Sequence, residues 1–159
     1  DLCQYVDVCI SNEEDAKDVF GIEAEDTDIY GGKLNHDGYK SVAKQLADKF
    51  NFTYVAITLR ESRSAFDNGW SAMLYNVAND EYCFSKKYNL HIIDRVGGGD
   101  SFGGGLIYSL LSGKSTQEAV EFAVAASALK HSIGGDYNMV TVPEVEKLAG
   151  GDGSGRIQR

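Results

Sequence analysis

The stretch IIDRVGGGDSFGGGLIYSLLSG, residues 92–113, decides the fold predicted for this chain. An apolar pair leads into Asp94, three glycines stand at 97–99, and Asp100 opens a long apolar segment. This order predicts a strand, a tight turn and then a helix over 100–112. The N-terminal end of a helix has unpaired N–H groups and a partial positive charge, so it attracts anions. Asp100 alone can be a helix cap, but the three glycines before it indicate that a second anion comes close.

This glycine turn matches neither of two common nucleotide-binding motifs. Phe102 stands where a dinucleotide-binding fingerprint needs its last glycine, and no Gly-Lys-Ser/Thr sequence closes a P-loop. The amides of Gly97, Gly98 and Gly99 can instead form a nest for an oxyanion or a phosphoryl group. Beside such a nest, Asp100 can take a proton from a hydroxyl while the amides stabilise charge on the transferring phosphoryl group. The alternative is a cap and a tight turn without a ligand.

Composition and charge exclude several classes of protein. With 159 residues, of which 43% are hydrophobic and 25% charged, the chain is long enough for one domain with a core. The formal net charge of −9 argues against nucleic acid or an anionic membrane surface as a partner. No apolar run approaches the ~20 residues that span a bilayer. The three cysteines lack CxxC spacing, which favours reduced thiols and a cytoplasmic location over disulfides or a zinc site.

The remaining pattern predicts alternating strands and helices without a second domain. Strands are expected at 5–10, 52–59 and 89–94, with a hairpin of 70–77 and 81–88 after a turn-rich connection over 60–69. Helices are expected after a cap at Ser11 or Asn12, and over 36–51, 100–112, 117–131 and 141–149, followed by a flexible tail at 150–159. Ser115 with Glu118 gives a capping box, as does Thr141 with Glu144.

This order of elements predicts an α/β fold with a mainly parallel sheet. Ligands of such sheets bind at the carboxyl ends of the strands, where Asn12, Arg60 and the 97–100 turn would all lie. Three more glycines, at 103–105, stand inside the predicted helix. Each costs about 1 kcal/mol relative to alanine, so they indicate that another element packs closely against this helix.

These residues resemble a known family. DRVGGGDSFGGGLIYSLL is similar to the Asp-Thr-x-Gly-Ala-Gly-Asp-x-Phe signature of the ribokinase-like (PfkB) carbohydrate kinases, and CISNEED is similar to their Asn-x-x-Glu motif. YVAITLRES resembles the strand and loop that meet the nucleotide phosphates. The family's helix and loop beside the adenine are similar to FAVAASALKHSIGGDYNMVTVPEVEKL. The resemblance covers residues 6–148 and is greatest to 2-keto-3-deoxygluconate kinases. It implies a Rossmann-type three-layer αβα sandwich.

The resemblance also implies a reaction, which is ATP-dependent transfer of a phosphoryl group to the primary hydroxyl of 2-keto-3-deoxygluconate. Asp100 would be the base that deprotonates this hydroxyl, and Gly97, Gly98 and Gly99 would form the anion hole for the γ-phosphoryl group. Asn12 would organise Mg²⁺ and phosphate. Asp15 falls where the family has a glutamate, and its shorter arm would shift a bridging water. Asp94 and the carbonyls near Val96 resemble the monovalent-cation (K⁺) site of some relatives.

Other positions match the family's nucleotide and substrate contacts. The residues that fall on its ATP-binding Thr-Leu-Gly-x-x-Gly loop are Thr58, Leu59, Arg60, Glu61 and Ser62. Arg60 and Arg63 replace both glycines, so Arg60 would contact phosphate by charge. Val124, Ser127 and Ala128 would line the adenine slot, or would simply pack within a helix. Asp136 matches a position that contacts substrate, or belongs to an ordinary Gly-Asp turn.

Kinases of this family are about twice as long, which implies that residues 1–149 are their C-terminal, nucleotide-binding and catalytic part. We then expect the isolated chain to be inactive and to self-associate as a homo-oligomer through an exposed edge or apolar face. Two alternatives remain: a fructokinase or other ketose kinase, and a non-catalytic nucleotide-binding or assembly module. The intact Gly97–Asp100 sequence favours a kinase, because a binding module has no use for the base.

Overall fold

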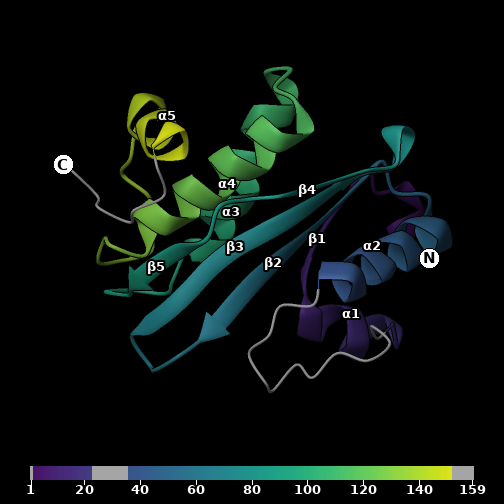
Figure 1. Cartoon of the computed structure of the whole chain (residues 1–159), viewed down its shortest axis with the longest axis horizontal. Helices are drawn as coiled ribbons and strands as arrows, with labels where there is room; N and C mark the ends of the chain where they lie inside the picture. The colour runs from purple at the N-terminus through teal and green to yellow at the C-terminus, as the bar shows by residue number, and fades with distance from the viewer. Residues whose placement is uncertain (1, 23–35, 152–159) are drawn as a thin grey trace. The chain divides into compact units, whose positions relative to one another are not determined.

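The computed structural model describes residues 2–22 and 36–151, which form two compact units (Figure 1). The first unit comprises Asp1–Leu59 and Ala72–Cys83, and the second comprises Arg60–Ser71 and Phe84–Arg159. Three strands contribute residues to both units, namely β2 (Tyr54–Ser62), β3 (Asp67–Asn76) and β4 (Glu81–Phe84). The strand order is β1-β2-β3-β4, and β5 also pairs with β3.

The first unit contains a parallel pair of strands and two helices. Strand β1 (Val8–Asn12) pairs with β2 in a register that aligns Val8 with Tyr54 and Asn12 with Thr58. Helix α1 (Glu13–Phe20) packs against β1 and α2 (His36–Phe50) (Figure 1). The buried residues of α2 have the spacing of one helical face and include Val42, Ala43, Leu46 and Ala47. The 3₁₀ helices η1 (Leu2–Tyr5) and η2 (Val77–Asn79) and most of β4 (Glu81–Phe84) also belong here.

The second unit is built around one buried helix. Helix α4 (Thr116–Lys130) contacts both α3 (Gly98–Leu111) and α5 (Val142–Gly150), as Figure 1 shows. Its residues are buried on nearly all sides, which is typical of a core helix. Strand β5 (Tyr88–His91) pairs antiparallel with β3, with Asp67 opposite His91 and Trp70 opposite Tyr88. The sheet therefore contains parallel and antiparallel pairs.

The α/β fold and the helix starts agree with the sequence. The Asn12 side chain caps α1, and the predicted capping box of Ser115 and Glu118 begins α4. Strands β3 and β4 are neighbours, as the predicted hairpin requires. None of the helices within 2–22 and 36–151 is long and apolar enough to cross a membrane. The predicted tail lies outside the described residues, except for Gly150, which ends α5, and Gly151.

The strand bounds differ from the prediction at several places. Strand β4 ends at Phe84 where 88 was expected, and β5 spans Tyr88–His91 where 89–94 was expected. Residues 2–5 form a 3₁₀ helix, so the first strand begins at Val8 and not at Tyr5. Strand β2 continues to Ser62 and β3 begins at Asp67, which leaves 63–66 as the connection where 60–69 was expected. The polar residues of this stretch resemble a loop in the sequence. They are strand residues because they pair with other strands, as Asp67 does with His91.

Gly104 and Gly105 provide a test of how closely α3 and α4 pack. A Cβ atom on Gly105 would lie 3.1 Å from Ala123 Cα and 3.2 Å from Ala126 Cβ, whereas one on Gly104 would meet nothing within 4 Å. We expect Gly105→Ala to lower the free energy of unfolding by about 1–3 kcal/mol through overpacking. Gly104→Ala should raise it by up to about 1 kcal/mol, because alanine favours the helix. Urea unfolding measures both values, and a Gly105→Ala protein as stable as the unmodified chain would contradict the close packing.

Candidate functional site

The predicted glycine turn forms the start of α3. Gly97 is the N-cap residue, and its φ of 78° is left-handed, a conformation that glycine adopts readily. Gly98, Gly99 and Asp100 form the first turn of the helix, where N–H groups lack acceptors within the helix. The Gly98 N–H donates to the carbonyl of Arg95, before the helix, at 3.2 Å. A Cβ on Gly99 would meet nothing within 4 Å, so the space beside it is open. Asp100 is exposed on the same turn. This arrangement can place an anion beside a carboxylate.

The C-terminal end of α4 supports this turn. Ser127 is fully buried, and its hydroxyl donates a hydrogen bond of 2.8 Å to the Gly98 carbonyl. The His131 ring packs against Gly98, with Cε1 only 2.7 Å from the position that a Cβ would take. A Cβ on Gly97 would collide with the carbonyl oxygen of Asp136. Two of the three glycines are therefore in close contact with α4 or with the loop that follows it.

Asp94 connects the segment before the turn to the same loop. Its carboxylate accepts hydrogen bonds from the Val96 N–H at 3.0 Å and from the Gly135 N–H at 2.8 Å. The bond from Val96 is the largest cause that lowers the pKa of Asp94 below its ordinary value, and the bond from Gly135 adds to it. Carboxylate oxygens have more than one lone pair, so Asp94 and the Val96 carbonyl retain capacity for a monovalent cation, which stays a prediction. The part of the chain that the structure describes holds no cluster of three His, Cys, Asp or Glu residues suited to a metal.

The end of β2 carries three of the predicted nucleotide contacts. Arg60 and Ser62 are exposed, whereas Glu61 is largely covered. The Glu61 carboxylate pairs with Lys87 Nζ at 3.0 Å and with an Arg63 nitrogen at 3.5 Å. Glu61 thus neutralises neighbouring lysine and arginine charges, while Arg60 remains an exposed cation.

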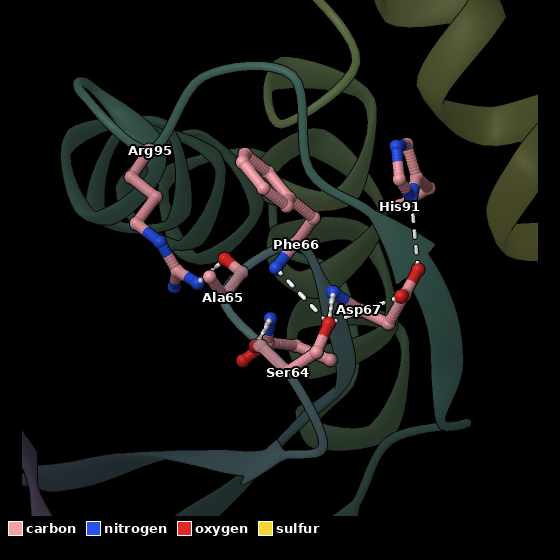
Figure 2. Close-up of polar contacts among 7 residues, drawn as sticks. Ser64, Ala65, Phe66, Asp67, His91 and Arg95 are labelled. Atoms are coloured by element: carbon pink, nitrogen blue, oxygen red, sulfur yellow. Dashed lines mark hydrogen bonds and ion pairs between the residues drawn. The ribbon is translucent and has the colours of Figure 1, made fainter.

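The turn between β2 and β3 is fixed by polar contacts that the sequence analysis did not identify (Figure 2). Ser64 Oγ accepts hydrogen bonds from the N–H groups of Phe66 and Asp67, at 3.2 and 2.8 Å, and donates to the Asp67 carboxylate at 3.0 Å. The other oxygen of this carboxylate lies 2.8 Å from His91 Nδ1. The bonds from His91 and Ser64 lower the pKa of Asp67. Arg95, which precedes the glycine turn, donates to the Ala65 carbonyl, so the two turns are connected directly.

A pocket of about 270 Å³ lies in the second unit. Its lining comes from β5, from the C-terminal end of α4 and from α5, and consists of Tyr88, Asn89, Leu90, His91, Ala128, His131, Ser132 and Leu148. Of the residues predicted to line an adenine slot, Ala128 borders this pocket, while Val124 and Ser127 are fully buried. For the other pocket residues the sequence contains one signal, because Tyr88 and Leu90 alternate with the polar residues Asn89 and His91 along β5. The pocket can accept a flat, mainly apolar group.

The remaining predicted contacts belong to the first unit. The parallel register aligns Asn12 with Thr58 at the carboxyl ends of β1 and β2. Asn12 Oδ1 accepts from the Asp15 N–H at 2.8 Å, and the Asp15 carboxylate accepts from the Asn12 N–H at 3.1 Å. These two side chains therefore form a capping box of α1, and Leu59 is buried. The roles predicted for these four residues in phosphate and magnesium binding stay predictions.

His131 should make the stability of the second unit depend on pH. Burial is the main cause that lowers the pKa of His131 from its ordinary 6.5. The hydrogen bond to the Ser127 carbonyl raises the pKa and opposes this shift, whereas the charges of Lys130, Arg95 and Arg60 lower it further. The unfolded chain therefore binds a proton more readily than the folded chain below about pH 6.5. Stability should be complete above this pH and fall as the pH drops toward the lowered value. Urea midpoints at pH 8, 7, 6 and 5 measure this fall, and a His131→Asn variant should show a smaller slope. Equal slopes would contradict the assignment to His131.

Comparison with known proteins places the chain in one family. The profile described as pfkB family carbohydrate kinase matches residues 1–143, and the chain belongs to this family. The resemblance inferred from the sequence is therefore confirmed.

The most informative relatives are two proteins named as kinases of 2-dehydro-3-deoxy sugar acids. A crystal structure of 2-dehydro-3-deoxygluconokinase from Thermotoga maritima matches 94% of this chain with 48% identity and a TM-score of 0.86. A 2-dehydro-3-deoxygalactonokinase from Haloferax volcanii is 27% identical over 152 residues. The chain spans only 43% and 41% of the lengths of these two proteins. A ribokinase structure from Thermotoga maritima, with 22% identity and a TM-score of 0.63, shows that the fold is ribokinase-like.

Proposed function

We propose that residues 1–149 are the C-terminal, nucleotide-binding and catalytic part of a longer ATP-dependent sugar-acid kinase. The observation that carries this proposal is the turn at Gly97–Gly99, where helix N–H groups without acceptors in the helix stand on the same turn as the exposed carboxylate of Asp100, with open space beside Gly99. Membership of a family of carbohydrate kinases supports phosphoryl transfer over any other use of an anion nest.

The proposed reaction assigns separate tasks to the carboxylate and to the amides. Asp100 takes the proton of the sugar's primary hydroxyl as the hydroxyl oxygen forms a bond to the γ-phosphorus and the bond to the β,γ-bridging oxygen breaks. The amides of Gly97, Gly98 and Gly99 donate to the phosphoryl oxygens and stabilise their charge. Bound Mg²⁺ would neutralise phosphate charge, with Asn12 and Asp15 as the residues proposed to organise it.

The pocket beside Ala128 is the proposed site of the nucleotide base. Its walls include the apolar side chains of Leu90 and Leu148, and Tyr88 is almost completely buried behind them. A purine is a flat group that such walls can enclose. Arg60 is the exposed cation proposed to meet a phosphate. Asp136 is proposed to contact the sugar acid.

The proposed substrate is 2-keto-3-deoxygluconate. The 48% identity to a protein named 2-dehydro-3-deoxygluconokinase supports this substrate over the C4-epimeric sugar acid of the more distant relative, at 27%. A fructokinase and a non-catalytic nucleotide-binding module are the alternatives from the sequence. An exposed carboxylate beside the nest disfavours the non-catalytic module, which has no need of a base.

The first experiment is a calorimetric titration of the 159-residue chain with Mg·ATP. We expect saturable binding without phosphoryl transfer, because most of the proposed sugar contacts lie in the rest of the kinase. Rates of the longer kinase with 2-keto-3-deoxygluconate, 2-keto-3-deoxygalactonate and fructose then identify the substrate. A kinase that prefers fructose would contradict the sugar-acid assignment, and a full-length protein that binds no ATP would contradict the function as a whole.

A further inference from the structure

Lys86 fastens the C-terminal end of α5. Its Nζ donates hydrogen bonds to the carbonyl oxygens of Ala149 at 2.8 Å and Gly151 at 2.6 Å. The last carbonyls of a helix have no partner within it and carry partial negative charge, so an ammonium group satisfies both needs. The Tyr88 hydroxyl adds a hydrogen bond of 3.3 Å to the Leu148 carbonyl. Residues 148–151 are therefore held by two side chains from the segment that leads into β5.

The segment that carries Lys86 is itself held in place by α4. The Lys86 N–H donates to both carboxylate oxygens of Glu121, at 3.1 and 3.2 Å. Gln117 Nε2 donates to the Phe84 carbonyl at 2.9 Å and to Glu121 at 3.1 Å. Because its backbone is bound to α4 and its ammonium group to α5, Lys86 joins the two helices.

Leu148 connects this polar attachment of α5 to the pocket. Val145 is the fully buried residue of α5, and Leu148 is partly covered. Leu148 lines the pocket of the second unit, and its own carbonyl is the acceptor of Tyr88. The position of this wall of the pocket therefore depends on the residues that hold the end of α5.

We propose that Lys86 is a positioning residue for the nucleotide: it holds the C-terminal end of α5 so that Leu148 closes the base pocket. This rests on the proposed function of that pocket. Lys86 touches neither the glycine turn nor Asp100 in any contact described above. Its loss should therefore weaken ATP binding and raise KM for ATP, while kcat stays the same.

The test compares three variants of this chain. Lys86→Met keeps most of the side-chain volume but removes the donors, while Lys86→Arg keeps donors for both carbonyls. Lys114→Met is the matched control, because Lys114 also binds α5, through Glu146 at 3.1 Å, but Glu146 is not among the pocket residues. Hydrogen exchange of the amides of residues 142–151, without nucleotide, measures the attachment of the helix end. Calorimetric titration measures the affinity of each variant for Mg·ATP.

We expect Lys86→Met to exchange faster at residues 148–151 and to bind Mg·ATP about tenfold more weakly, as the loss of charged hydrogen bonds predicts. Lys86→Arg should retain both properties, and Lys114→Met should bind Mg·ATP like the unmodified chain. Unchanged exchange or unchanged ATP affinity in Lys86→Met overturns the proposal, as does equal weakening by Lys114→Met. If the unmodified chain binds no Mg·ATP, the same variants are titrated in the longer kinase. A longer kinase that binds no ATP overturns the nucleotide role of the pocket, and the exchange data then show only whether Lys86 holds α5.

Discussion

Replacing Asp100 with asparagine should abolish phosphoryl transfer by the longer kinase while its affinity for Mg·ATP stays nearly unchanged. The amide that replaces the carboxylate cannot take the hydroxyl proton, and loss of a general base typically lowers kcat by about 10²–10⁴-fold. The side chain is exposed on the first turn of α3, so the fold does not depend on it. Only a small favourable interaction with the helix N-terminus is lost, about 0.3–1 kcal/mol.

The matched control for this substitution is Asp37→Asn. Asp37 is an exposed acid in the first turn of α2, in the other unit, where it pairs with Lys40 at 3.2 Å. The chemical change is the same, so the control reports the cost of losing a first-turn carboxylate. Normal turnover of Asp100→Asn would remove the base from the mechanism. A parallel loss of turnover in both variants would assign the effect to stability.

Local patterns in the sequence were sufficient to predict the elements around the site. The capping box of Ser115 and Glu118 and the tight turn at 97–99 depend on residues within four positions of each other, so they can be predicted directly from the sequence. The position of Asp100 at the start of a helix was also predicted from its immediate neighbours. Helix starts depend on such short-range hydrogen bonds, which is why they agree with the structure.

Contacts between distant residues could not be predicted from the same patterns. The family resemblance implied that Ser127 lines an adenine slot, which stays a prediction. The hydrogen bond from its hydroxyl to the Gly98 carbonyl, 29 residues away, was not predicted. The pocket combines β5 with the ends of α4 and α5, and its wall at Leu148 is held by Tyr88, 60 residues earlier. Nothing in the separate stretches indicates that they meet. The polar start of β3 was read as a loop because its pairing partners lie on β5, further along the chain.

Gly97→Ala should destabilise the second unit and abolish Mg·ATP binding. A left-handed φ of 78° costs an alanine about 1–2 kcal/mol, and its Cβ would collide with the Asp136 carbonyl and lie 3.3 Å from Lys130 Cε. A backbone carbonyl cannot move without shifting the loop that Asp94 holds through Gly135. We expect the free energy of unfolding to fall by about 2–4 kcal/mol, the sum of strain and overpacking. Urea unfolding measures this loss.

Gly99→Ala separates the fold of this turn from its use as an anion site. Gly99 lies in the helix, and an added Cβ meets nothing within 4 Å, so stability should be kept or rise by up to about 1 kcal/mol. If phosphate approaches the amides of the nest, the new methyl group occupies part of the open space and Mg·ATP affinity falls despite the intact fold. Unchanged affinity in a stable Gly99→Ala protein would mean that the glycines form only a tight turn. Because Gly97→Ala alters strain and contacts together, the Gly99 variant is the one that tests whether these amides bind phosphate.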